Sequence, residues 1–344
     1  DAMTGAAGPR LVLVVGVGRS GTSLLAGILG QLGLHIPQPE VKADETNPRG
    51  FGEPRWVVDF HRRLMAERRV TVFDARPAAW EATRAAAADA AVQAELRGWL
   101  AEQFAQAGAV VVKDPRSGWF LPLWTRAAAD AGAAVSFVTM LRHPAEILAS
   151  ARRSYGTWQS DASRAASWLN VMLETERSTR GASRAFVRYE DLLADWAEQV
   201  ARVGEQADVP ALAGVRRDAF PQVDAFVDPT LHRARVGWED HDVPASAREM
   251  AEVAWEQLQV LARRGGDVAA ALAALDATRP AYEALYREAE AIAQSSVTAA
   301  RPRRRGARPA PARPPSLRVR LARRIPARHR RSIRRALGSL RRRR

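Results

Sequence analysis

The sequence contains no cysteine, which excludes disulfide bonds and metal sites with cysteine ligands. It also lacks a long hydrophobic run: the longest, Leu11–Val17, is far shorter than the roughly 20 residues that cross a bilayer. No N-terminal stretch combines the basic start and the apolar segment of a secretory signal. These absences, which fit a reducing compartment, predict a cytoplasmic protein.

Acidic residues are missing where the positive charge is highest. Residues 301–344 contain 19 of the 52 basic residues, all of them arginine, and no Asp, Glu or Lys. The other 33 basic residues face 38 acidic ones, so residues 1–300 carry a net charge of −5 although the whole chain carries +14. The overall basicity is therefore no argument for a nucleic-acid-binding enzyme. Lysine occurs only twice, at Lys42 and Lys113, either by chance or because a site needs a compact ammonium group.

The length of 344 residues, with 47% hydrophobic and 26% charged residues, is ordinary for a chain with a packed core and excludes a wholly disordered protein. We expect a flexible leader over residues 1–10 and one domain over residues 11–296. Residues 297–344 form a basic tail rich in arginine and proline, which we expect to be disordered or partly an amphipathic helix.

Short, continuously apolar segments alternate with helical patterns along the domain. They predict buried strands over Leu11–Val17, Ala109–Lys113, Val135–Leu141 and Ala185–Arg188. The helices expected from apolar spacing and alanine content begin after Ser23 and cover Pro54–Met65, Ala78–Gln106, Ala145–Arg153 and most of Ala245–Gln294. This order predicts an α/β protein with a P-loop-like, three-layer fold, in which helices cover both faces of a central parallel sheet. Ligands of such sheets bind beyond the carboxyl ends of the strands.

The turn Gly16–Ser23 lies between the first strand and its helix and has the features of an anion site. Its glycines let the backbone approach an anion closely, and the free N–H groups of the helix start point at it. A Walker A loop would need lysine where Thr22 stands, which argues against a kinase or NTPase. The glycines also fit a dinucleotide-binding pattern, but the second strand that this pattern requires is interrupted by two prolines in residues 33–40.

The loop Arg19-Ser-Gly-Thr-Ser23 resembles the 5′-phosphosulfate loop of sulfotransferases that use PAPS, 3′-phosphoadenosine-5′-phosphosulfate. The resemblance is to the bacterial and Golgi-type branch, which has arginine where cytosolic members have lysine. Arg142 and Ser150 have the spacing of the family's 3′-phosphate site. Tyr189 lies in a segment that resembles one in which the family's tyrosine packs near the adenine. Packing of Tyr189 in the core is the alternative, and both roles are compatible. By weaker analogy, Arg233 or Arg235 would cover the cofactor. The resemblance implies PAPS as cofactor, PAP as product, and these binding residues: Arg19, Ser20, Gly21, Thr22, Ser23, Arg142, Ser150 and Tyr189.

The resemblance also implies how sulfuryl transfer is catalysed. The reaction needs cations around the leaving phosphate and a base for the acceptor's proton, and we expect no metal. We assign Arg19 as the main cation and Lys113 as the second. For Lys113, an ion pair with Asp114 or a solvated position at the strand end is an equal alternative. Glu53 follows a segment similar to one of bacterial members and is the expected base; a plain acid at a helix start is its alternative. Three further candidate bases are Asp44, Glu45 and His61.

At Gly52 the family usually has tryptophan, which leaves the acceptor class open. The sequence thus predicts an enzyme that moves the sulfuryl group from PAPS to a hydroxyl, or less readily an amine, of a carbohydrate, lipid-linked or secondary-metabolite acceptor. The alternatives are an NAD(P)-binding oxidoreductase and an inactive protein that binds polyanions or membranes. For the tail, an anionic inner-membrane surface ranks first, a disordered extension second and nucleic acid third.

Overall fold

The computed structural model describes residues 8–45, 47, 49–228 and 236–300. Residues 1–289 form one compact unit and residues 290–344 a second, of which the described part is the C-terminal end of a long helix. Most of the expected leader and tail, together with Arg233 and Arg235, lie outside the described residues. In the described ranges no helix is both long enough and apolar enough to cross a membrane.

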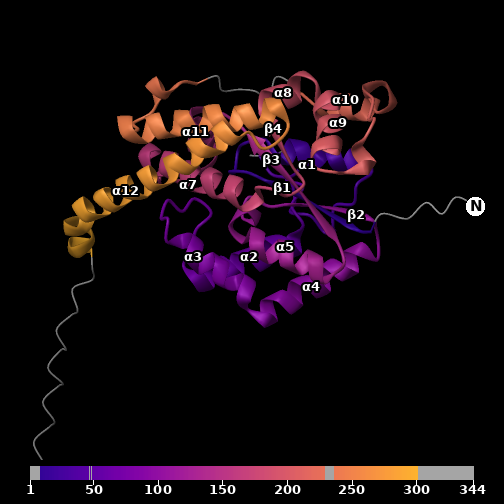
Figure 1. Ribbon diagram of the computed structural model, residues 1–344, viewed down its shortest axis with the longest axis horizontal. Helices are drawn as coiled ribbons and strands as arrows, with labels where there is room; N and C mark the ends of the chain where they lie inside the picture. The colour runs from indigo at the N-terminus through magenta and orange to yellow at the C-terminus, as the bar shows by residue number, and fades with distance from the viewer. Residues whose placement is uncertain (1–7, 46, 48, 229–235, 301–344) are drawn as a thin grey trace, which may run out of the picture. The chain divides into compact units, whose positions relative to one another are not determined.

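In the part of the chain that the structure describes, four strands and twelve α-helices carry the fold (Figure 1). The strands are Arg10–Val15 (β1), Ala109–Lys113 (β2), Ala134–Leu141 (β3) and Arg184–Arg188 (β4). The first six helices are Thr22–Gln31 (α1), Arg55–Arg68 (α2), Ala79–Arg84 (α3), Ala90–Phe104 (α4), Leu121–Asp130 (α5) and Pro144–Tyr155 (α6). The others are Asp161–Thr179 (α7), Tyr189–Ala194 (α8), Trp196–Gln206 (α9), Pro221–Phe226 (α10), Ala245–Arg264 (α11) and Ala269–Ala300 (α12).

The four strands form one parallel sheet in the order β2-β1-β3-β4. β1 lies inside the sheet, with Val14 opposite both Lys113 of β2 and Val138 of β3. Because the strands run the same way, their carboxyl ends meet at one edge. The chain passes from β1 to β2 on one side of β1 and then crosses to β3 on the other side. The crevice between β1 and β3, where the strand order reverses, is where parallel sheets of this kind bind ligands.

Helices cover both faces of the sheet, which confirms the predicted α/β class. Alternate residues of β1 point to opposite sides, so Leu11, Leu13 and Val15 join one apolar cluster while Val12 and Val14 join the other. The second cluster is completed by α1, α8, α9 and α10, which lie together on one side of the sheet in Figure 1. The first is completed by α2–α7, α11 and the beginning of α12.

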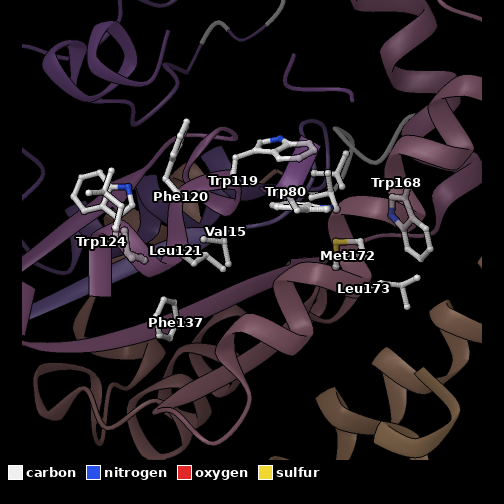
Figure 2. Close-up of a cluster of buried hydrophobic side chains, with 14 of the residues drawn as sticks. Val15, Trp80, Trp119, Phe120, Leu121, Trp124, Phe137, Trp168, Met172 and Leu173 are labelled. Carbon is white, nitrogen blue, oxygen red and sulfur yellow. The ribbon is translucent and has the colours of Figure 1, made fainter. Parts of the chain in front are cut away.

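The larger cluster is rich in tryptophan. Trp80 and Trp119 stack with their ring centroids 3.8 Å apart, and Trp124 and Trp168 are also fully enclosed in this layer (Figure 2). Each indole removes a large apolar area from water, so this layer supplies much of the driving force for folding. It fixes the segment that follows β2, because Trp119 lies only six residues after Lys113.

Two regions with a helical sequence pattern are divided in the structure. Ala78–Gln106, which was expected to be helical, is helical on both sides of Asp89, where the chain becomes extended. The Asp89 carboxylate accepts hydrogen bonds from the backbone N–H groups of Ala91 and Val92 and so caps the start of α4. Aspartate is preferred at this N-cap position and is less favourable inside a helix. The region Ala245–Gln294 is likewise divided at Gly265, whose φ of 71° ends α11.

A buried polar group connects α2, the end of β2 and α5. The Trp124 indole N–H donates to His61 Nε2 at 3.0 Å, so the other ring nitrogen carries the proton and donates to Asp114 Oδ2 at 2.8 Å. Arg116 donates to the second oxygen of Asp114 at 2.7 Å. Burial by itself would raise the pKa of Asp114, but its hydrogen bond from His61 and the nearby positive charge of Arg116 outweigh burial and lower it to about 2.

We predict that Asp114→Asn lowers the free energy of unfolding at pH 7 by about 2 kcal/mol, the value of a pKa drop from 3.8 to about 2. The folded-state pKa is depressed, so this stabilisation is present above pH 3.8 and is lost as the pH falls toward 2. Urea titrations between pH 7 and pH 2 measure both effects. The exposed Asp130→Asn serves as the matched control, and an unchanged pH dependence in Asp114→Asn would contradict the assignment.

Candidate active site

The loop between β1 and α1 crosses the carboxyl edge of the sheet at close range. Gly16 has a φ of 136°, which favours glycine, and a Cβ there would lie 2.9 Å from the carbonyl oxygen of Met140 in β3. Arg19 also has a positive φ, 75°, although it carries a side chain. Backbone strain of this kind costs about 1–2 kcal/mol and is concentrated at functional sites. It singles out Arg19 independently of its charge.

The amino end of α1 is open to a ligand. Gly21 is the N-cap residue with a φ of 101°, no side chain in the described structure caps the helix, and its first turn holds no acidic residue. A Cβ on Gly21 would collide with the ring of Tyr189, the first residue of α8. The uncapped N–H groups and the helix dipole make this end an anion site.

A cavity of about 510 Å³ opens in front of this helix end. That volume lies within the range of ordinary cofactor sites. The loop and α1 contribute Arg19, Gly21, Thr22, Ser23 and Leu24, and α6 and the neighbouring strand ends contribute Arg142, Ser150, Arg153, Ser154 and Tyr189. The remaining lining residues are Glu45, Asn47, Arg49, Gly50 and Phe226.

The basic side chains of this cavity hold each other in place. Arg19 Nε donates to Ser150 Oγ at 3.1 Å, and Arg142 Nη1 donates to the carbonyl oxygen of Arg19 at 3.2 Å. Arg142 also pairs with Glu146 at 2.8 Å, and its guanidinium lies 4.6 Å from the centroid of the Tyr189 ring. Arg142 thus joins the ends of β1, β3 and β4, and only 8% of it is exposed.

The cavity carries a surplus of positive charge. Its lining contains four arginines and one acid, Glu45, a formal net charge of +3. Arg142 and Arg49 have carboxylate partners, Glu146 and Asp228. Within the described residues Arg19 and Arg153 have none, so the donor set fits a ligand with phosphate or sulfate groups. No group of His, Asp and Glu in the described ranges is arranged to hold a metal ion.

Behind the loop lies a buried ion pair that connects two predicted catalytic residues. Lys113 Nζ donates to Glu53 Oε1 at 2.6 Å and to Ser23 Oγ at 3.1 Å. Lys113 is 2% and Glu53 8% exposed. Asp114, which was one expected partner of Lys113, binds His61 and Arg116 instead. The lysine therefore links the end of β2 to the start of α1 and to the residue just before α2.

Most of the predicted residues come together, and the exceptions are informative. Seven of the predicted binding residues line the cavity: Arg19, Gly21, Thr22, Ser23, Arg142, Ser150 and Tyr189. Ser20 does not, and its buried Oγ has no partner among the described residues. Glu53 and Lys113 lie behind the lining rather than in it. Of the other candidate bases, Glu45 lines the cavity, whereas both ring nitrogens of His61 are already engaged.

Seven lining residues were not among the predicted site residues: Leu24, Asn47, Arg49, Gly50, Arg153, Ser154 and Phe226. Arg153 could have been found, because it follows Ser150 by three residues on α6 and so shares its helix face. Arg49 and Phe226 meet through a cation–π contact, with 5.6 Å between the guanidinium carbon and the ring centroid. They lie 177 positions apart in the sequence, so no local pattern links them.

The geometry agrees with a comparison to protein families. The sequence model of the sulfotransferase family matches residues 9–213. This chain belongs to the sulfotransferase family. Among solved structures it is similar to the sulfotransferase domain from the Synechococcus PCC 7002 olefin synthase, with 18% identity and a TM-score of 0.37, over 71% of this chain and 94% of that chain. No curated protein matches the chain.

We predict that Glu53 and Lys113 of this sulfotransferase are energetically coupled. Glu53→Gln and Lys113→Met should each lower the free energy of unfolding by about 3 kcal/mol, because each leaves a buried charge without its partner. The double variant should lose less than the sum, with a coupling of about 2 kcal/mol in chemical denaturation.

The exposed pair Arg63 and Glu95 provides the control cycle, with Arg63→Gln and Glu95→Gln. Its coupling should stay below about 1 kcal/mol. Additive effects of the Glu53 and Lys113 substitutions would show that the buried pair does not form in solution.

Proposed function

We propose that this sulfotransferase takes the sulfuryl group from PAPS and transfers it to a hydroxyl, or less readily an amine, of a small-molecule or glycan acceptor. The acceptor is a carbohydrate, a lipid-linked molecule or a secondary metabolite. The observation that carries the donor assignment is the cationic cavity at the carboxyl edge of the sheet, where an uncapped helix start meets Arg19, Arg142 and Ser150. A nucleotide with phosphates at both ends of its ribose matches a cavity lined by four arginines, of which Arg19 and Arg153 have no carboxylate partner among the described residues.

In this proposal each group has a separate task. The amino end of α1, with Thr22 and Ser23, and the guanidinium of Arg19 hold the 5′-phosphosulfate. Arg142 and Ser150 hold the 3′-phosphate, because a planar fork and a hydroxyl on adjacent elements suit a dianion. The Tyr189 ring, already under the guanidinium of Arg142, provides an apolar face for the adenine.

The transfer chemistry is assigned to Glu53, Lys113 and Arg19. PAPS supplies the sulfuryl group and leaves as PAP, which keeps the electron pair of the broken sulfur–oxygen bond. A Glu53 carboxylate oxygen accepts the proton that the acceptor hydroxyl loses as its oxygen bonds to sulfur. Lys113 fixes Glu53 relative to Ser23 at the helix start, so the base and the cationic loop keep a defined separation. Arg19 stabilises the negative charge that develops on the leaving phosphate.

The oxidoreductase alternative finds no support in the sheet. A dinucleotide-binding fold needs a strand directly after the first helix. In the described structure the chain after α1 makes only isolated bridges, such as His35 with Val110, before α2 begins. The strands that flank β1 are β2 and β3, which come much later in the sequence. The anionic-membrane interpretation of residues 297–344 remains a proposal, since almost all of that segment lies outside the described residues.

We predict that the full-length protein binds PAP in calorimetric titration but does not bind NAD⁺. Arg142→Ala should weaken PAP binding by at least about tenfold, because one charge-assisted hydrogen bond to the ligand is lost. Arg97→Gln, an exposed change on α4, removes the same charge away from the cavity and should leave PAP binding unchanged.

The arginine-rich residues 301–344 require a salt series, because binding to them falls steeply with ionic strength. Titrations at low and high salt separate that contribution from binding in the cavity. Absence of PAP binding in a folded protein, or equal binding by Arg142→Ala, would rule out the donor assignment.

A further inference from the structure

A second cavity, of about 170 Å³, lies between α3, α7 and the beginning of α12. None of its lining residues lines the candidate active site, so the two cavities are separate. We refer to it as the α7 cavity. The proposed reaction assigns no role to it.

Three arginines from three different helices converge on one buried acid in the α7 cavity. Glu174 of α7, whose side chain is 4% exposed, pairs with Arg84 at the end of α3 through one oxygen. Its other oxygen forms an ion pair with Arg177 at 2.7 Å and accepts a hydrogen bond from Arg279 of α12 at 3.2 Å. One carboxylate therefore serves three guanidinium groups, each of which has five N–H donors.

The lining of the α7 cavity has more guanidinium groups than carboxylates. It holds three arginines and two acids, Glu174 and the exposed Glu283. Burial, together with the like charge of Arg177, lowers the pKa of Arg279, although the nearby carboxylates act in the opposite direction. Arginine nevertheless stays protonated in proteins, so all three guanidinium groups remain donors for an anion.

The α7 cavity also has apolar lining residues. They are Trp80, Tyr282, Pro77 and Leu173. The polar atoms of both rings are already used: the Trp80 indole N–H donates to Asn170 at 2.9 Å, and the Tyr282 hydroxyl donates to the carbonyl oxygen of Ala75. A cavity of about 150 Å³ holds benzene, so the α7 cavity has room for a ring of that size. The charged group of such a ligand would meet Arg84 and Arg177, whose side chains are 44% and 42% exposed to solvent.

We propose that the α7 cavity binds a small organic monoanion, with its ring or compact apolar part against Trp80 and Tyr282 and its oxyanion group on Arg84, Arg177 and Arg279. Carboxylate, sulfonate and sulfate-ester groups share the required chemistry, because their oxygens match the fork of a guanidinium. The α7 cavity is separate from the cavity of the candidate active site, since the two have no lining residue in common.

The test uses the full-length protein labelled with 5-fluorotryptophan and observed by ¹⁹F NMR, with Trp80→Phe to assign the Trp80 signal. Benzenesulfonate is the anionic probe, and benzenesulfonamide is its neutral counterpart of nearly equal shape. Residues 301–344 contain no tryptophan, so anion binding to their arginines does not move the Trp80 signal directly. The exposed Trp158 reports non-specific effects.

We expect a saturable shift of the Trp80 signal with benzenesulfonate, a much smaller one with benzenesulfonamide, and the same benzenesulfonate response when PAP is present. Arg84→Gln combined with Arg177→Gln should raise the half-saturating concentration at least about tenfold, while Arg279 continues to pair with Glu174 and preserves the fold. The control Arg62→Gln combined with Arg97→Gln removes two exposed charges and should change nothing.

Three results would overturn the proposal: equal shifts with the two probes, an unchanged response in the Arg84 and Arg177 double variant, or displacement of benzenesulfonate by PAP. Because the readout is local to Trp80, the first two results are independent of whether the protein binds PAP or transfers a sulfuryl group. The third result would show that PAP itself occupies the α7 cavity.

Discussion

All four strands of this protein end at the same edge of one sheet, and the candidate active site is a consequence of that constraint. The residues that follow β1, β2, β3 and β4 are a glycine-rich loop, Asp114, Arg142 and Tyr189. Parallel pairing brings these four points within reach of one another although they span more than 170 positions of the chain. The uncapped start of α1 then directs N–H groups into the same space.

Some charged groups at this edge are paired and buried, whereas others line the open cavity. Lys113 with Glu53 and Asp114 with His61 are enclosed, and each has hydrogen-bond partners that offset the cost of leaving water. Arg19 and Arg153 line the cavity without a carboxylate in the described ranges. The enclosed pairs thus fix the framework, and the open arginines are left for an anionic ligand.

The tryptophan-rich layer connects the framework to the second cavity. Trp119 fixes the segment after β2, while its stacking partner Trp80 forms a wall of the α7 cavity. Asn170 of α7 donates to the carbonyl oxygens of Asp74 and Arg76 and also accepts from Trp80. The Trp80 wall of the α7 cavity is therefore held by contacts that also reach the segment following β2.

The sequence by itself determined the four strands, the parallel α/β class and the anion-binding loop, because apolar runs and glycine spacing are local signals. It also singled out Arg142 and Lys113, which stand at or just beyond a strand end, and Ser150, whose spacing from Arg142 resembles that of the sulfotransferase family. Only the tertiary structure decided that Lys113 pairs with Glu53 rather than Asp114, that Asp89 interrupts a long alanine-rich helix, and that Arg49 and Phe226 meet at the cavity. Those outcomes depend on contacts between segments far apart in the chain, where burial and charge pairing outweigh local preference.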